Sequence, residues 1–214
     1  MKGLIIIPAR KNSKRLKRKN IKKLDKKPLI QYTIDFAKRI KVTPYIIVST
    51  DDVLIKSIAL KNNLICPGLR PKRFSLDRSK SYDFTKYSID WFKKNFFFKP
   101  DYIILLQPTS PFRSKKTFNK MFSIFRKNKT SISTFNKIIS KDYSKSFIAK
   151  PTGNIFINST QNILKYKSFI NKKTIRFFTT SKKEQIDIDT ISDFKIARKI
   201  LFSKNKKKNK GLFK

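Results

Sequence analysis

Short apolar runs and segments with helical periodicity alternate along the chain, and polar loops separate them. The apolar runs are typical of buried strands, and we expect strands at residues 4–7, 45–50, 64–66, 102–106, 131–135, 154–158 and 174–179. Apolar side chains recur at helical spacing in other segments, which predicts helices over residues 29–40, 52–62, 83–95, 115–127 and 192–202. This order predicts an α/β fold, with a mostly parallel sheet that carries helices on both faces.

The domain organisation follows from the same pattern. Residues 1–203 contain all the predicted strands and helices and are expected to form one domain. Residues 204–214 are basic and are expected to form a solvated tail.

Three of the apolar runs are followed by polar loops that offer different chemistry. The first loop, residues 10–19, is dense in positive side chains. Ligands of open α/β sheets bind at the carboxyl ends of strands, so this loop indicates a polyphosphate ligand. The second loop runs from Gln107 to Arg113 and offers amide and hydroxyl groups between two prolines, which suits a polar ligand such as a sugar. An ordinary proline-rich turn explains the second loop equally well.

The third polar loop contains two acidic residues two positions apart. Side chains two residues apart in an extended segment point the same way, with their Cα atoms about 7 Å apart, so Asp187 and Asp189 would face one side. Ile186, Ile188 and Ile191 would pack on the other side. Two carboxylates on one face repel each other unless a cation lies between them, and oxygen ligands without His or Cys suit Mg²⁺. The alternative is a solvated strand end without a metal.

Composition adds a question about charge. The chain has 214 residues and a formal net charge of +40, which would fit nucleic acid as a partner. The positive residues are mostly Lys, however, and they are spread along every segment together with abundant Asn, Ile, Phe and Tyr, as an AT-rich coding sequence would give. We therefore interpret most of this charge as background, and nucleic acid is not the expected partner.

Several functional classes are disfavoured. The chain has no His, so imidazole serves neither as base nor as metal ligand, and its one Cys, Cys66, leaves no internal disulfide. Cys66 lies in an apolar run and is expected in the core. The apolar stretch near the start, of about five residues, is too short for a signal-peptide core or a membrane span, and we expect a cytoplasmic protein without membrane contact. No glycine-rich phosphate motif is present, which argues against P-loop and dinucleotide enzymes.

A set of motifs resembles one enzyme family. The motifs are IIIPARKNSKRLKRKN, KPLIQYTID, IIVSTDD, LRPKRFSLD, LLQPTSPFR, PTGNIFI and IDIDT, and they follow the family's order from about residue 3 to 200. The chain is in this respect similar to the acylneuraminate cytidylyltransferases, the synthetases of CMP-sialic acid and CMP-legionaminic acid. The resemblance implies a nucleotide-diphospho-sugar transferase (Rossmann-like) fold, a homodimer and Mg²⁺. It also implies transfer of CMP from CTP to the anomeric hydroxyl of a 2-keto sugar acid, a nonulosonic acid used for surface glycans such as lipopolysaccharide or capsule, with release of pyrophosphate.

The resemblance also assigns roles to individual residues. It places Arg10, Lys14 and Lys19 at the triphosphate as the catalytic side chains. The nucleotide would be bound by Ser13, Asn20, Arg70 and Ser81. The sugar would meet Gln107 and Phe156, together with the nearby hydroxyls of Thr109 and Ser110, and the metal would be held by Asp187 and Asp189.

The chain departs from the family between residues 114 and 150, a stretch that is shorter than in close relatives. In those relatives this part forms a dimer arm and gives basic contacts to the partner's sugar carboxylate. Substitutes for these contacts would be Lys137, Lys141, Lys145 and Lys150. Two alternatives stay open, namely a cytidylyltransferase for the eight-carbon acid Kdo and a nucleic-acid-binding protein on a decayed transferase scaffold. The sequence does not identify a general base.

Overall fold

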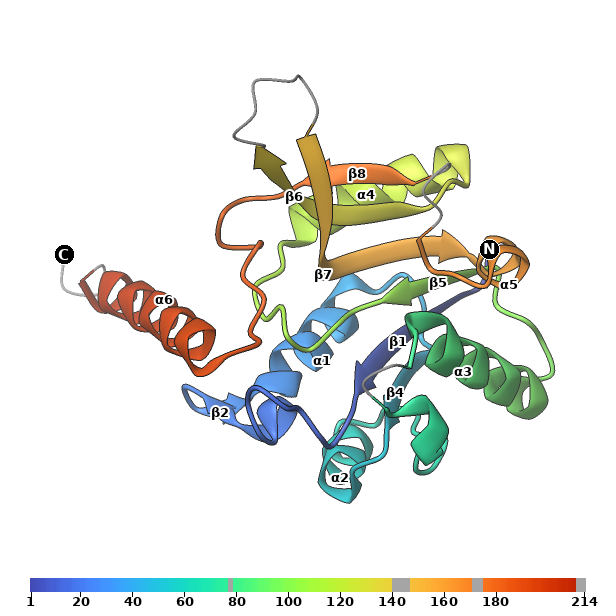
Figure 1. The fold of residues 1–214 in the computed structure, drawn as a ribbon, viewed down its shortest axis with the longest axis horizontal. Helices are drawn as coiled ribbons and strands as arrows, with labels where there is room; N and C mark the ends of the chain where they lie inside the picture. Colours follow the sequence, from blue (N-terminus) through green and yellow to red (C-terminus); the bar gives the residue numbers. More distant parts are fainter. Residues whose placement is uncertain (77–78, 140–146, 171–174, 211–214) are drawn as a thin grey trace.

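Six strands form one sheet in the computed structural model, which describes residues 1–76, 79–139, 147–170 and 175–210 (Figure 1). The strands lie in the order β4 (Ile46–Thr50), β1 (Gly3–Ala9), β5 (Tyr102–Leu105), β7 (Phe147–Ser159), β6 (Ile132–Ile139) and β8 (Arg176–Thr179). Strand β1 pairs in parallel with β4 and β5, and β6 pairs in parallel with β8. Strand β7 is antiparallel to both of its neighbours. The predicted mostly parallel sheet is confirmed.

Strand β1 lies between β4 and β5 and is buried on both sides. The side chains of Ile5 and Ile7 face one apolar cluster, and those of Leu4 and Ile6 face another. Because helices cover both faces, the strand is a continuous apolar run instead of an alternating one. The sequence LIII therefore fixes β1 in the interior and directs its carboxyl end, at Ala9, to the edge where the polar loops begin.

Helices cover the two faces of the sheet as the sequence predicts. One face packs against α1, α2 and α4, and the other packs against α3 and α5. Polar side chains cap several of these helices: Asp52 accepts a hydrogen bond from the backbone of Leu54 (2.7 Å) at α2, and Ser114 accepts one from Thr117 (3.2 Å) at α4. The helices are α1 (Leu29–Ile40), α2 (Val53–Lys61), α3 (Ser81–Phe96), α4 (Lys115–Asn128), α5 (Thr160–Tyr166) and α6 (Ile191–Lys210).

The first half of helix α6 packs against the rest of the chain. Phe194 and Ala197 join a third cluster with Leu16 and Leu24, and the helix then extends away from the sheet (Figure 1). It continues to Lys210 and not to residue 202, so the segment expected as a tail is helical as far as that residue. Lys favours helices, and no Gly or Pro interrupts this stretch. Within the described residues, no helix has the length and apolar character needed to cross a membrane.

Short elements complete the edge of the sheet where the site forms. A two-stranded hairpin of β2 (Lys23–Leu24) and β3 (Lys27–Pro28) follows the one-turn helix η1 (Lys19–Ile21). A second one-turn helix, η2 (Lys72–Phe74), precedes α3.

Some predicted boundaries are wrong. The strand expected at residues 64–66 is reduced to one bridge between Ile65 and Ile47, because Pro67 cannot donate to a ladder and Gly68 turns the chain with a φ of +95°. Strands β6 and β7 extend beyond the predicted ranges and form a hairpin that projects from the sheet (Figure 1). Helix α5 was not expected. Its N-terminus is capped by Ser159, which accepts a hydrogen bond from Asn162 (3.1 Å).

Candidate active site

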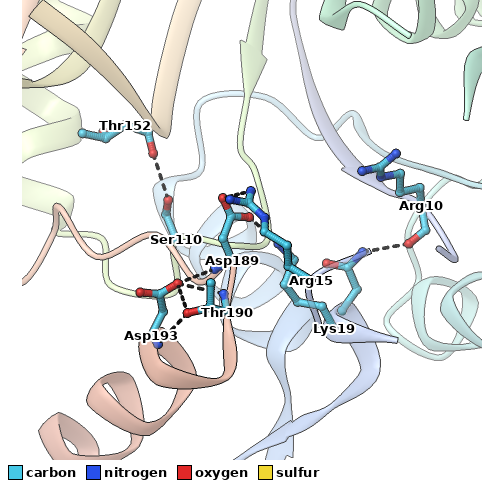
Figure 2. Close-up of polar contacts among 9 residues, drawn as sticks. Arg10, Arg15, Lys19, Ser110, Thr152, Asp189, Thr190 and Asp193 are labelled. Atoms are coloured by element: carbon cyan, nitrogen blue, oxygen red, sulfur yellow. Dashed lines mark hydrogen bonds and ion pairs between the residues drawn. The ribbon is translucent and has the colours of Figure 1, made fainter. Parts of the chain in front are cut away.

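A cavity of about 570 Å³ opens where β1 and β5 end, and the three polar loops surround it. The structure brings together all the residues assigned to the site except two, and the lining includes Arg10, Ser13, Lys14, Lys19, Asn20, Arg70, Ser81, Gln107, Thr109, Asp187 and Asp189. Ser110 is buried behind the cavity, where its hydroxyl donates to the carbonyl of Thr152 (3.4 Å) (Figure 2). Phe156 is 6 % exposed and packs edge to face against Phe169 in the core, so it does not line this cavity.

The cationic loop is folded back on itself between β1 and η1. The side-chain amide of Asn20 donates to the carbonyl of Arg10 (3.0 Å) and closes the loop (Figure 2). Leu16 is buried in the third apolar cluster and anchors its middle. Lys11 and Lys17 are exposed and do not line the cavity, whereas Lys19 is buried beside the acidic loop.

The acidic loop is held against the second loop and is not part of a strand. The backbone of Ile188 donates to the carbonyl of Thr109 (2.8 Å), and the Ile188 side chain is fully buried. The expectation of an extended strand with all three Ile packed is wrong, because the chain turns into α6 and Ile191 is exposed. Asp187 and Asp189 nevertheless both line the cavity.

The two carboxylates have different surroundings. Burial raises the pKa of Asp187, although a hydrogen bond from the Thr109 hydroxyl acts in the opposite direction. One oxygen of Asp187, Oδ1, is buried without a hydrogen-bond partner. Asp189 is paired with two cations, since its Oδ2 lies 2.5 Å from Arg15 Nη2 and its Oδ1 lies 2.8 Å from Lys19 Nζ.

These carboxylates fit a metal that also binds the substrate. The part of the chain that the structure describes contains no group of three or more His, Cys, Asp or Glu side chains able to hold a metal. Mg²⁺ needs fewer protein ligands, because it is usually bound through one or two carboxylates together with substrate phosphates and water. The unpartnered Oδ1 of Asp187 and the carboxylate of Asp189 form such a donor set.

A buried arginine organises the second loop from behind. The guanidinium of Arg113 donates to the Gln107 carbonyl (2.5 Å), the Asn154 carbonyl (2.7 Å) and the Thr33 hydroxyl (2.9 Å). Burial lowers the pKa of Arg113 to about 9, although the Asp187 carboxylate acts in the opposite direction. The Asn154 side chain donates to the Glu184 carbonyl (2.7 Å), so the same network joins β7 to the segment before the acidic loop.

One part of the cavity has an apolar lining. Phe74, Leu76 and Phe84 line it, and the guanidinium of Arg70 lies 5.3 Å from the Phe84 ring centre. Arg70 Nε donates to the Ser75 hydroxyl (3.0 Å), while its Nη1 is buried without a partner. Burial lowers the pKa of Arg70 to about 10. An apolar wall beside a free planar donor is suited to a nucleobase.

Some lining residues were not expected from the sequence. Phe74 and Leu76 lie within the motif LRPKRFSLD but received no role, and Ser79 and Phe84 follow that motif. Arg15 was counted with the other loop cations and received no role. The basic substitutes expected in the hairpin are not tested, since the side chains of Lys137 and Lys150 and all of Lys141 and Lys145 lie outside the described part.

The fold is that of nucleotidyltransferases. A CMP:2-keto-3-deoxy-manno-octonic acid synthetase solved in complex with CTP superposes with a TM-score of 0.74 at 16 % identity, covering 95 % of this chain and 100 % of that one. A 4-diphosphocytidyl-2C-methyl-D-erythritol synthase from Anaerococcus prevotii superposes with a TM-score of 0.65 at 18 % identity, covering 94 % and 98 %. At these identities the likeness establishes the fold, which is the nucleotide-diphospho-sugar transferase fold expected from the sequence.

Sequence comparison identifies the family within this fold. Residues 4–207 match the cytidylyltransferase family model, and the chain belongs to this family. A CMP-N,N'-diacetyllegionaminic acid synthase from Legionella pneumophila is 32 % identical over 94 % of this chain and 97 % of its own length. An N-acylneuraminate cytidylyltransferase from Escherichia coli is 32 % identical over 97 % of this chain, which spans about half (54 %) of that relative. A pseudaminic acid cytidylyltransferase from Campylobacter jejuni is 28 % identical over 96 % of this chain and 98 % of its own length.

Proposed function

We propose that this protein transfers CMP from CTP to the anomeric hydroxyl of a nonulosonic acid and releases pyrophosphate. The observation that carries this proposal is the meeting of the three polar loops around one cavity in a chain of the cytidylyltransferase family. The relatives named above act, by their names, on legionaminic, sialic or pseudaminic acids, all of them nonulosonic acids. The product would supply surface glycan synthesis.

Different residues of the cavity lining would bind different parts of the substrates. Arg70 and Ser81 would bind the cytidine against the apolar wall, and Gln107 would lie between nucleotide and sugar. The hydroxyl oxygen would form its bond to the α-phosphorus while the bond to pyrophosphate breaks. Catalysis of this transfer rests on positioning and on neutralising phosphate charge, which is the role we propose for Arg10, Lys14 and Lys19. Ser13 and Asn20 would hold the phosphates and the nucleotide from the same loop.

We propose Mg²⁺ as the cofactor, held by Asp187 and Asp189. When bound, it supplies positive charge to the phosphate oxygens and orients them. The partnerless oxygen of Asp187 supports this assignment, because a buried carboxylate oxygen without a donor is costly unless a ligand satisfies it.

On the proposed sugar side, Gln107 and Thr109 line the cavity. Thr109 lines the cavity but also holds Asp187, so we propose a joint role for it. Ser110 would act only by fixing the loop to β7, and Phe156 only through the core. A homodimer is also proposed, from the resemblance. Light scattering of the purified protein tests it.

Purified protein given CTP, Mg²⁺ and a panel of nonulosonic acids should release pyrophosphate. Kdo belongs in the same panel, because an eight-carbon acid used in preference to all nonulosonates would replace the proposal with the Kdo alternative. Absence of release with every acid, at concentrations that permit dimers, would refute the enzyme assignment. The affinities for DNA and RNA, measured at rising salt, test the alternative of a nucleic-acid-binding protein. Affinity that falls steeply with salt, in a protein without transferase activity, would establish that alternative.

A substitution at the proposed metal site tests whether the site is needed for turnover and not merely for folding. Asp189→Asn should abolish turnover and leave the fold intact, because the pair with Arg15 is largely exposed and the Asn carbonyl can still accept a hydrogen bond from the buried Lys19. Asp90→Asn is the matched control, since Asp90 forms a surface pair with Lys86 on α3. Wild-type turnover in Asp189→Asn would contradict the metal assignment and favour the alternative of a solvated segment without a metal.

A further inference from the structure

Arg15 contacts the acidic loop at Asp189, one of the two proposed metal ligands, and has no role in the assignments made so far. Its guanidinium reaches from the cationic loop to Oδ2 of Asp189, 2.5 Å away, while Lys19 takes Oδ1 of the same carboxylate at 2.8 Å (Figure 2). Both oxygens that would bind a metal at Asp189 therefore already have cationic partners. A metal that binds this carboxylate therefore competes with these cations and is repelled by their charge.

The two cations differ in how firmly they are held. The Lys19 side chain is 10 % exposed, and it is part of the buried wall beneath Asp189. The Arg15 side chain is 66 % exposed, and its carboxylate partner is 35 % exposed. Exposed ion pairs contribute little net stability, because both groups are well solvated when apart. Arg15 is therefore the cation that can leave Asp189 at low cost.

The charge around the cavity determines when a metal can replace Arg15 at Asp189. Its lining contains five cationic side chains (Arg10, Lys14, Arg15, Lys19 and Arg70) against two carboxylates, a formal balance of +3 from these seven residues. A divalent cation entering alone meets this excess and the Arg15 pair. A triphosphate reverses the balance and offers Arg15 a second anionic partner on the same wall, because guanidinium binds phosphate as well as carboxylate.

We propose that Arg15 and the metal ion exchange at Asp189. In the free protein Arg15 pairs with the carboxylate, and when nucleotide and metal enter together it turns to the triphosphate and leaves Oδ2 to the metal. This inference rests on the proposed function, and it adds Arg15 as a triphosphate contact and as the group that keeps the free protein from binding metal alone. The side chain makes one contact in the absence of nucleotide and another in its presence.

The test measures the affinities of one variant for Mn²⁺ and for CTP, which should change in opposite directions. Mn²⁺ binding to the free protein is followed by electron paramagnetic resonance of unbound Mn²⁺, and CTP binding without metal is followed by calorimetry in EDTA. Arg15→Gln should tighten Mn²⁺ binding about fivefold by removing the competing pair, and should weaken CTP binding about tenfold by removing a phosphate contact. Arg18→Gln is the matched control, because Arg18 is an exposed cation of the same loop that does not line the cavity.

A structural or purely long-range role of Arg15 predicts different results. Loss of both affinities in Arg15→Gln, or changes equal to those of Arg18→Gln, would overturn the exchange. Arg15→Lys, which keeps the charge, should keep most of the CTP affinity and bind Mn²⁺ more tightly than the wild type, because one ammonium holds a carboxylate less well than a guanidinium. If the wild-type protein binds no CTP at all, the proposed function itself fails, and the inference fails with it; wild-type CTP binding together with an inert Arg15→Gln overturns the inference alone.

Discussion

Gly153 lies in β7, directly against the side chain of Gln107. Its φ of +72° is in the left-handed region, and a Cβ built there would lie 2.1 Å from Gln107 Oε1 and 3.0 Å from its Cδ. Neither distance is compatible with van der Waals contact. Gly153→Ala must therefore displace the Gln107 amide, which the proposal places between nucleotide and sugar.

Two separate costs follow from this geometry. The left-handed backbone costs an Ala residue about 1–2 kcal/mol of folding stability. Loss of one substrate hydrogen bond from the displaced amide costs about 1.4 kcal/mol, at the upper end of the usual range, which lowers kcat/KM for the sugar acid about tenfold. CTP affinity should stay near the wild-type value, because the proposed nucleotide contacts come from other loops.

Gly68→Ala is the control for the backbone cost. Gly68 has a φ of +95°, and a Cβ there would meet no atom within 4 Å. Both variants should therefore lose stability in urea denaturation, but only Gly153→Ala should lose sugar-acid kcat/KM in a pyrophosphate-release assay. An unchanged kcat/KM in Gly153→Ala, or an equal loss in Gly68→Ala, would refute the placement of Gln107 by Gly153.

Two further changes test the supports of the site. Arg113→Lys should lower the free energy of unfolding by about 3 kcal/mol, measured by urea denaturation, because one ammonium cannot serve three separated acceptors and leaves buried carbonyls unpaired. Asp193 lies in the first turn of α6 and forms a capping box with Thr190. Burial acts to raise the pKa of Asp193, but hydrogen bonds from Thr190 and Asp189 outweigh burial and lower this pKa. A lowered pKa means that this stabilisation is present above the pKa of an unfolded Asp and is lost as pH falls through the lowered value. Asp193→Asn should therefore cost about 1 kcal/mol near pH 7 and nothing in strong acid, so a pH-independent difference from the wild type would contradict this role.

The sequence predicts well which loops meet at the cavity, because local signals carry this information. Apolar runs fix β1, β4 and β5 in the interior, and their carboxyl ends bring the polar loops that follow β1 and β5 to one edge. The acidic pair reaches this edge as well, although through a backbone hydrogen bond to Thr109 and not through a strand. The chemistry of these loops could be predicted from residue types without knowing the pairing.

The features that the sequence does not reveal depend on distant partners. Phe156 has the same polarity whether it lines a pocket or packs on Phe169, and only the register of β7 decides between these positions. Arg113 is one cation among many until its burial is known. Thr190 and Asp193, in contrast, form a T-x-x-D pattern before α6, and a search for capping boxes would have found them.

The single reversed strand has a consequence for how the enzyme varies. β7 runs antiparallel to β5, and the first β7 residue in this pairing, Phe156, lies opposite Leu105 at the carboxyl end of β5. β7 approaches the cavity through Gly153, which lies against Gln107, whereas the cavity lining itself comes from the three polar loops and from residues 70–84. A hairpin changes length at its tip without shifting the registers at its base. In this architecture the hairpin can therefore vary in length while the loops that line the cavity stay in place.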